Sequence, residues 1–352
     1  MMRKRIGWDL RCLSADGSPG AGIPHAAREL WSACVKERSE DIDLIAFVAE
    51  NACLDEAGTV IRLPSSHSRA LREVVRAHPI DLLFCPSGTV PFGLSVGAIP
   101  WIHDLAILNH PEWFPESWWR RTFTTQLVRR GIRRAPCTLV VSDATKREVI
   151  RWTALDPAQV IVTGQGIELP KQEETLPPSL QGKNYALILG TVEPRKNCLF
   201  LQSIWPDVCH HLAEEIPLVI AGQQGWGNSA LQETPSLIRI SDVSEAARLA
   251  LLRHAAVVLI PSLYECFGRV AAEALTLGIP VIASDRGALP EVIGQAGQCL
   301  PLDQYRWVKA VVDTIRPGPI RSYWVVQAHT AKNTFSWTPI VKRVLANLQE
   351  NC

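Results

Sequence analysis

Residues 256–294 constrain the fold of this chain more than any other stretch. They begin with a short apolar run, Val257–Ile260, which predicts a buried strand of a parallel sheet. A loop and a helix-forming segment follow, and the helix is expected to end at Gly278. Apolar residues recur along this helix at Val270, Ala274 and Leu277. Residues 281–283 predict a second buried strand, and in such units ligands bind where the first strand ends and the helix begins.

The same alternation of strands and helices continues through the chain and predicts an α/β fold with parallel, doubly wound sheets. Apolar runs of strand length occur at 6–10, 44–48, 60–63, 82–85, 99–102, 139–141, 161–162, 185–189, 218–221 and 238–240. The chain has 352 residues, of which 47% are hydrophobic and 20% charged, so two domains with sizeable cores are expected.

We expect two Rossmann-like domains that face a central cleft. The predicted divisions are an N-terminal domain at 1–168, a linker at 169–184, a C-terminal domain at 185–335, and a helix at 336–352 that returns to the domain junction. The linker is predicted because its residues are charged, contain proline and show no apolar period.

Composition excludes several classes of protein. A net charge of +1 argues against a generally basic nucleic-acid binder. The ten cysteines form no CxxC pair, which is typical of reduced, mostly buried thiols in a cytoplasmic protein. No apolar run reaches 18 residues, and the charged N-terminal start has no apolar core after it. Neither a transmembrane helix nor a secretory signal is therefore expected.

Two adjacent cations, Arg195 and Lys196, follow the predicted strand at 185–189 and precede a helix that begins near Asn197. Cations at a strand end and amides at a helix start are suited to bind a diphosphate. Such groups stabilise negative charge on a phosphate when no metal is bound. The alternative is an exposed Arg–Lys pair without a ligand.

Two glutamates, Glu265 and Glu273, lie eight residues apart in the opening stretch. From the unit alone, Glu273 could equally be a helix former that faces solvent near the positive helix end. Asp41 and Asp43 have the Asp-x-Asp spacing of metal-dependent glycosyltransferases, but they precede a strand and so lie at the wrong end of the sheet. We interpret them as solvated charges and expect no metal site.

A glycine-rich loop, with Gly17, Gly20 and Gly22, follows the first strand and precedes a helix from about Pro24. Its spacing is not the GxGxxG fingerprint, which argues against a nicotinamide cofactor. The segment 118–134 carries six arginines: Arg120, Arg121, Arg129, Arg130, Arg133 and Arg134. It is either a partly packed helix with a basic solvated face or a contact for an anionic lipid surface.

These motifs together resemble the retaining glycosyltransferases of family 4, which have the GT-B fold. The resemblance rests on an ordered set spread over nearly the whole chain: the glycine loop, His103-Asp104-Leu105, Glu193-Pro194-Arg195-Lys196-Asn197, Gly225-Trp226, the Glu265 to Glu273 unit and Phe335-Ser336-Trp337. Three positions depart from the family pattern, where Gly is usual at Cys266 and an aliphatic residue followed by Pro at Arg269 and Val270.

The resemblance implies a role for each matching residue. His103 would lie beside the anomeric carbon, Glu265 would contact the transferred sugar, and Glu273 would bind the ribose. Asp104 would orient His103 or bind acceptor, and Arg269 would alter sugar choice or bind an acidic group. The catalytic set it implies is His103, Asp104, Arg195, Lys196 and Glu265. The donor-binding set is Gly20, Gly22, Gly190, Arg195, Lys196, Gly222, Tyr264, Glu265, Phe267, Gly268, Arg269 and Glu273.

The expected activity is retaining transfer of a hexose from a nucleoside diphosphate sugar to a hydroxyl of a glycan or lipid-linked acceptor, without a bound metal or other cofactor. The segments HDLAILNHPEWFP and GQQGW resemble mannosyltransferases of the family, so GDP-mannose is the favoured donor, with a UDP-linked hexose next. The N-terminal domain would hold the acceptor and the C-terminal domain the donor. The alternatives are a sugar-nucleotide epimerase and a non-catalytic nucleotide-sugar-binding module. The protein is expected in the cytoplasm or at the inner face of the membrane.

Overall fold

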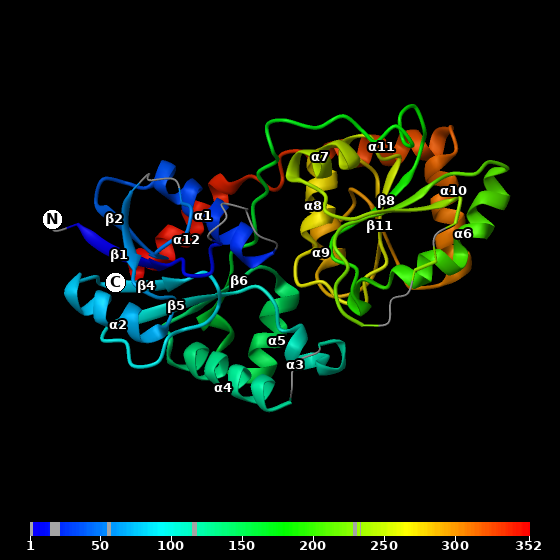
Figure 1. Cartoon of the computed structure of the whole chain (residues 1–352). Helices are drawn as coiled ribbons and strands as arrows, with labels where there is room; N and C mark the ends of the chain where they lie inside the picture. The colour runs from blue at the N-terminus through cyan, green and yellow to red at the C-terminus, as the bar shows by residue number, and fades with distance from the viewer. Residues whose placement is uncertain (1–2, 15–21, 55–57, 115–117, 228–230, 233) are drawn as a thin grey trace. The chain divides into compact units, whose positions relative to one another are not determined.

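The computed structural model describes residues 3–14, 22–54, 58–114, 118–227, 231–232 and 234–352. Its contacts divide the chain into two compact units (Figure 1). Unit 1 comprises Met1–Asn109, Glu116–Gly166 and Ser336–Cys352, and unit 2 comprises His110–Pro115 and Ile167–Phe335. Each unit is an α/β domain built on one parallel sheet, as the alternation of elements in the sequence predicts.

Unit 1 contains a seven-stranded parallel sheet with the order β3-β2-β1-β4-β5-β6-β7. Its strands are β1 (Lys4–Asp9), β2 (Ile42–Ala49), β3 (Thr59–Leu63), β4 (Leu82–Cys85), β5 (Gly97–Ile102), β6 (Thr138–Val140) and β7 (Val160–Val162). Its α-helices are α1 (Ile23–Glu37), α2 (Ser68–Ala77), α3 (Ala106–Asn109), α4 (Trp118–Arg134), α5 (Asp143–Thr153) and α12 (Trp337–Glu350). The strand order reverses between β1 and β4, so ligand-binding loops are expected at the carboxyl ends of these two strands.

Unit 2 contains a six-stranded parallel sheet with the order β10-β9-β8-β11-β12-β13. Its strands are β8 (Ala186–Leu189), β9 (Leu218–Ala221), β10 (Leu237–Ile240), β11 (Val257–Ile260), β12 (Val281–Ser284) and β13 (Gln298–Leu300). Its α-helices are α6 (Cys198–Leu212), α7 (Glu245–Arg253), α8 (Arg269–Thr276), α9 (Leu289–Ile293), α10 (Gln304–Ile315) and α11 (Pro319–Thr330). Here the order reverses between β8 and β11, which pair through Val257 and Ala186.

Large aromatic side chains fill the core of each unit. In unit 1 the ring of Trp8 lies 5.3 Å from Trp31 and 4.7 Å from Phe84, both edge to face. In unit 2, Trp205 is buried and its indole N–H donates to the carbonyl of Ile216 at 2.8 Å. These contacts remove apolar area from water. The indole N–H of Trp205 is hydrogen-bonded, whereas those of Trp8 and Trp31 are buried without a hydrogen-bond partner among the described residues.

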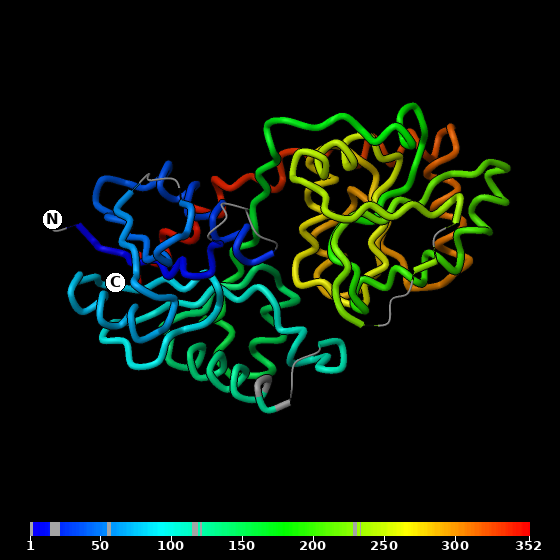
Figure 2. Tube along the Cα trace, viewed as in Figure 1, coloured from blue at the N-terminus to red at the C-terminus, as the bar shows by residue number. Residues whose placement is uncertain are grey.

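The C-terminal helix α12 belongs to unit 1, where it packs beside α1. Figure 2 shows this red segment among the blue N-terminal part of the chain. The predicted linker, residues 169–184, has no helix or strand, and Glu174 accepts a hydrogen bond from Ser244 at the start of α7. Unit 2 begins at Ile167 in this part of the chain and includes the segment.

Helix α8 is buried beyond the apolar positions that recur in its sequence, Val270, Ala274 and Leu277. The structure buries Ala271, Ala272, Ala274 and Leu275 fully, whereas Val270 and Leu277 are half-buried. The reason is that α8 contacts the sheet at β11 and β12 and also the helices α9 and α11, so it is enclosed on more than one side.

The ten cysteines are all free thiols, as expected, but only four of them are buried. Burial raises the pKa of Cys137 and Cys198 to about 11, which keeps both protonated at neutral pH. Within the described ranges, the structure contains no helix that combines the length and apolar character needed to span a bilayer.

Gly166 is expected to be essential for the packing of α12, because a Cβ on this residue would lie 2.2 Å from Cδ2 of Trp337. Trp337 is 8% exposed and has little space to move. We expect Gly166→Ala to lower the melting temperature, with a loss of about 1–3 kcal/mol from overpacking. Gly97→Ala is the matched control, since its nearest contact would be Leu82 at 3.4 Å. Equal melting temperatures for the two variants would contradict this packing.

Candidate functional site

The loops after β8 and β11 meet at the point where the strand order of unit 2 reverses. The loop after β8 contains a short 3-10 turn, η3 (Pro194–Lys196), which leads into α6 through Asn197. The amide of Leu263 donates to the carbonyl of Arg195 at 2.8 Å, and the side chain of Asn197 donates to the carbonyl of Pro261 at 3.1 Å. These two bonds fix the loops to each other, so residues 70 positions apart in the sequence become neighbours.

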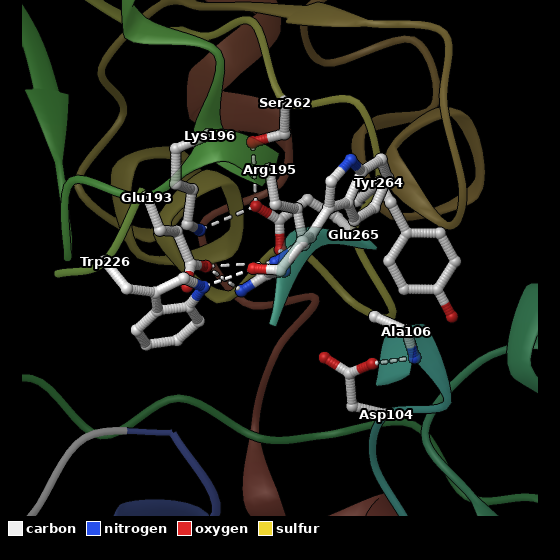
Figure 3. A network of polar contacts seen from close by, with 10 residues as sticks. Asp104, Ala106, Glu193, Arg195, Lys196, Trp226, Ser262, Tyr264 and Glu265 are labelled. Carbon is white, nitrogen blue, oxygen red and sulfur yellow. Dashed lines mark hydrogen bonds and ion pairs between the residues drawn. The ribbon is translucent and has the colours of Figure 1, made fainter. Parts of the chain in front are cut away.

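Glu265 is the centre of the polar network that joins these loops (Figure 3). Its carboxylate accepts hydrogen bonds from Lys196 Nζ at 2.7 Å and Ser262 Oγ at 2.9 Å, both on Oε1. Its other oxygen, Oε2, lies 3.3 Å from Nη1 of Arg195. Glu265 is 6% exposed, so this carboxylate depends on its cationic neighbours for the solvation it has lost.

Burial opposes ionisation of Glu265, but the positive charges of Lys196 and Arg195 prevail and lower its pKa. The folded pKa lies below that of an unfolded glutamate, about 4.3. The ion pairs therefore contribute stability that is complete above that value, and the contribution is lost as the pH falls through the lowered pKa. At neutral pH the site holds an ionised Glu265.

A second carboxylate, Glu193, balances the charge of this network. Nη2 and Nε of Arg195 donate to Glu193 Oε1 at 2.6 and 3.0 Å, and Glu193 is 5% exposed. Nη1 of the same guanidinium donates to the carbonyl of Tyr264 at 3.3 Å. Two cations thus face two carboxylates, and an incoming phosphate would have to compete with Glu193 and Glu265 for Arg195 and Lys196.

The second predicted glutamate, Glu273, lies in a separate ionic cluster on α8. It is completely buried, which excludes the alternative of a solvent-facing helix former. Its carboxylate forms an ion pair with Arg248 of α7 and accepts a hydrogen bond from Arg269 Nε at 2.9 Å. Arg269 therefore lies at the first turn of α8 with its charge directed to Glu273, one turn later in the helix.

Two predicted glycines have steric or conformational reasons to be glycine. A Cβ on Gly222 would lie 2.3 Å from the carbonyl oxygen of Gly190, so the ends of β8 and β9 approach each other closely. Gly268 has a φ of 88° immediately before α8, a conformation that favours glycine. A Cβ on Gly268 would also lie 2.8 Å from Cδ2 of Leu289, so both positions are closely packed at the strand ends.

Aromatic side chains surround the same loops in unit 2. Tyr264 and Phe267 are each 6% exposed. The ring of His110, in the segment His110–Pro115 of this unit, lies 6.0 Å from Tyr264 and stacks on Trp113 at 3.9 Å. The indole N–H of Trp226 donates to the carbonyl of Trp113. The HPEW and GQQGW segments are thus in contact within the unit.

In unit 1, His103 and Asp104 directly follow β5. His103 is 7% exposed, and its Nε2 lies 2.9 Å from the carbonyl of Pro86, so this nitrogen carries the hydrogen. Its ring packs edge to face on Trp101 at 4.2 Å. Asp104 Oδ1 accepts from the amide of Ala106 at 2.5 Å and caps the short helix α3, a local role that the sequence reasoning did not consider (Figure 3).

The glycine loop is described only at its end. Gly17 and Gly20 lie outside the described residues, as do the side chains of Arg120 and Arg121. Gly22 precedes α1 with a φ of 63°, and no atom lies within 4 Å of the Cβ it lacks. Asp41 and Asp43 flank the first residue of β2, at the amino end of the strand, as predicted.

Helix α4 has a basic face beside an apolar groove. Four of its arginines, Arg129, Arg130, Arg133 and Arg134, line one open cavity. The groove next to it is lined by Val90, Phe92, Leu94 and Leu127, with Arg130 and Arg134 at its edge. Phe92 is 56% exposed, and Cζ of Arg130 lies 4.6 Å from the centroid of its ring. Ile132 is fully buried, as expected for a partly packed helix.

Sequence reasoning missed several groups that hold the site: Glu193, Arg248, Ser262 and Gly287. A Cβ on Gly287 would lie 2.1 Å from the carbonyl oxygen of Glu265, and the amide of Ala288 donates to that oxygen at 2.8 Å. Glu193 could have been found, because it is two residues from Arg195 in the same loop. Arg248 carries no local signal, since it lies on another helix, 25 residues before Glu273 in the sequence, and only the tertiary fold brings the two side chains together.

Residues 172–316 match the family model described as Glycosyl transferases group 1. The O-antigen chain mannosyltransferase B of Escherichia coli is 26% identical over 310 residues, which cover 84% of this chain and 79% of that protein. The MMP alpha-(1->4)-mannosyltransferase of Mycolicibacterium hassiacum is 29% identical over 269 residues, which cover 69% of this chain and 64% of that protein.

Two solved structures resemble the whole chain. The sucrose-phosphate synthase of Thermosynechococcus elongatus has a TM-score of 0.75 at 16% identity, with 99% of each chain covered. HepE of Anabaena, solved in complex with UDP and glucose, has a TM-score of 0.68 at 16% identity, also with 99% of each chain covered. At this level of identity the similarity shows a shared fold.

Proposed function

We propose that this chain, whose residues 172–316 match the model of glycosyl transferases group 1 and whose fold resembles that of GT-B enzymes, is a retaining, metal-independent hexosyltransferase. Its donor is a nucleoside diphosphate sugar, with GDP-mannose as the favoured choice. The acceptor is a hydroxyl group of a glycan or of a lipid-linked sugar.

The observation that carries this proposal is the cluster of Arg195, Lys196 and Glu265 at the strand-order reversal of unit 2. The carboxyl ends of strands at such a reversal are where α/β sheets bind ligands. Two cations held there by protein carboxylates are ready to receive a diphosphate, and no rearrangement of the backbone is needed to bring them together.

In the proposed reaction the bond between the anomeric carbon and the diphosphate breaks, and the acceptor oxygen forms the new bond on the same face. The proton of the acceptor hydroxyl passes to the departing diphosphate. Lys196 and Arg195 stabilise the negative charge that develops on the departing diphosphate. Glu265 is released from Lys196 as the phosphate binds, and it then holds hydroxyls of the sugar. His103 of unit 1 would contact the donor sugar and orient the acceptor, and no protein nucleophile is assigned.

Two relatives support mannose as the transferred sugar, since both are named as mannosyltransferases. A UDP-linked hexose is the second candidate, because HepE, which shares the fold, binds UDP and glucose. A sugar-nucleotide epimerase would convert the donor without any acceptor, and a non-catalytic module would bind nucleotide without turnover.

A thermal-shift screen tests the donor site. The protein is mixed with GDP, UDP, ADP, dTDP and their common sugar conjugates in EDTA. We expect GDP and GDP-mannose to raise the melting temperature most, because binding to the native state alone stabilises it. Stabilisation by UDP instead would transfer the proposal to the second donor, and no shift with any nucleotide would contradict it.

We also propose that the protein works in the cytoplasm at the inner face of the membrane, held by the basic face of α4. Three exposed aromatic side chains support this contact: Phe92, Trp119 and Phe123. Cationic residues attract anionic lipid headgroups, and aromatic side chains beside them insert at the interface.

Vesicle sedimentation tests this contact. We expect binding to vesicles with phosphatidylglycerol and none to pure phosphatidylcholine, at a strength of about 1 kcal/mol per arginine near the surface. Replacement of Arg129, Arg130, Arg133 and Arg134 by Ser should abolish it. Replacement of four exposed basic residues outside α4 by Ser, namely Lys36, Arg38, Arg69 and Arg76, is the control for charge alone. Equal binding by the two variants would contradict a specific role for α4.

A further inference from the structure

We propose that Arg248 is a positioning residue for the nucleoside half of the donor, because it fixes the carboxylate of Glu273 from a neighbouring helix. This inference rests on the proposed function, in which Glu273 binds the ribose. It adds a second layer to the donor site that the sequence motif does not contain.

The geometry of Glu273 carries the first step. Its side chain is fully buried and receives three hydrogen bonds from arginines in the described part of the chain. Nη1 of Arg248 donates to Oε2, Nη2 of Arg248 donates to Oε1 at 3.1 Å, and Nε of Arg269 donates to Oε1 at 2.9 Å. The pair with Arg248 is bidentate, so it fixes the plane of the carboxylate in addition to neutralising its charge.

The arginines leave part of the hydrogen-bonding capacity of the Glu273 carboxylate unused. An ionised carboxylate offers about four acceptor sites, and the arginines occupy three of them. One site on Oε2 is left for a further donor, such as a hydroxyl group. A carboxylate in this state accepts a single hydrogen bond in a fixed direction, which is what recognition of one ribose hydroxyl requires.

Arg248 is itself held in place by a carboxylate of its own helix. Its Nε and Nη2 lie 3.1 Å from Oε2 of Glu245, one turn earlier in α7. Its side chain is 15% exposed. Burial opposes the charge on Arg248, but Glu273 and Glu245 prevail and raise its pKa, so the guanidinium stays charged at every working pH. A Glu245–Arg248–Glu273 chain therefore connects α7 to α8.

Arg269 cannot replace this function. It lies four residues before Glu273 on the same helix, so its ion pair with Glu273 is made within α8, whereas that of Arg248 joins α7 to α8. Without Arg248, Glu273 keeps one arginine and its helix position but loses the bond to Oε2. We therefore expect that the carboxylate of Glu273 loses its fixed orientation while the protein stays folded.

The experiment compares calorimetric affinities for GDP, 2′-deoxy-GDP and 3′-deoxy-GDP in the full chain and its variants. The wild type should bind GDP about 10–100-fold more tightly than one of the two deoxy forms, since a hydrogen bond to a charged group is lost. Arg248→Met should weaken binding of GDP about 10-fold or more and leave the affinity for that deoxy form nearly unchanged. The ratio of the two affinities should then be close to one. Arg248→Lys should restore part of the ratio.

Arg253→Met is the matched control, because Arg253 is on the same helix and pairs with Glu173 at 3.3 Å, half-exposed to solvent. It should keep the wild-type ratio. If Arg248 only supported the fold, its replacement would weaken binding of all three nucleotides equally, and that result would overturn the inference. If Arg248→Met does not fold, the same series with Arg248→Lys and Glu245→Gln decides, through the same ratio. Failure of the wild type to bind any nucleoside diphosphate would reject the proposed function instead.

Discussion

Replacement of Lys196 by alanine is expected to weaken binding of the nucleoside diphosphate about 10–100-fold and to lower transfer about 10²–10³-fold. The reason is that Lys196 Nζ is 2.7 Å from the buried Glu265 and is one of two cations at the end of β8. Without it, the leaving diphosphate has only Arg195, whose charge is already shared with Glu193. Calorimetry with GDP and a turnover assay with GDP-mannose measure the two losses.

Lys183→Ala is the control for Lys196→Ala. Lys183 is exposed and lies just before β8. Its replacement by alanine removes the same charge from the protein as Lys196→Ala does. It should leave affinity and turnover at the wild-type level. If Lys196→Ala behaved like Lys183→Ala, the diphosphate would not bind at this loop.

Replacement of Glu265 by glutamine is expected to act on binding and turnover in opposite directions. Glutamine keeps the size of the side chain but removes the negative charge that pairs with Lys196 and Arg195. GDP should then bind about tenfold more tightly, because a charge-assisted bond of about 1.5 kcal/mol no longer competes with the phosphate. Transfer should fall at least about 100-fold, since the charged group that faces the sugar is lost.

The sign of the affinity change is the sensitive part of this prediction. If Glu265 only supported the fold, glutamine would lower the melting temperature and weaken GDP as well. Tighter GDP binding with lost turnover would show that Glu265 occupies the cations until the donor arrives. Weaker GDP binding at an unchanged melting temperature would contradict that competition.

The sequence predicted most elements because buried parallel strands are continuous apolar runs and the helices between them have clear starts. Ser142 and Ser244 were recognisable as helix starts, and each side chain accepts from the amide three residues later. The apolar spacing of α8 gives only part of its burial, because periodicity describes one apolar side and α8 is enclosed by the sheet and two helices.

The site could be predicted only as far as strand ends determine it. Arg195, Lys196 and Glu265 each follow a strand, and adjacent strands bring them together. Their partners were not predictable in the same way. Glu193 turns back onto Arg195 through the 3-10 turn, and Arg248 reaches Glu273 through helix packing over 25 residues of sequence. Such contacts depend on tertiary structure and leave no local pattern.

One titration tests the central claim most directly. GDP is titrated in EDTA into the wild type, Lys196→Ala and Glu265→Gln under identical conditions. We expect GDP to bind measurably to the wild type, more weakly to Lys196→Ala and more tightly to Glu265→Gln. The two changes are opposite because Lys196 attracts the diphosphate and Glu265 competes with it for the same cations. Equal affinities for all three proteins would contradict a diphosphate site at the ends of β8 and β11.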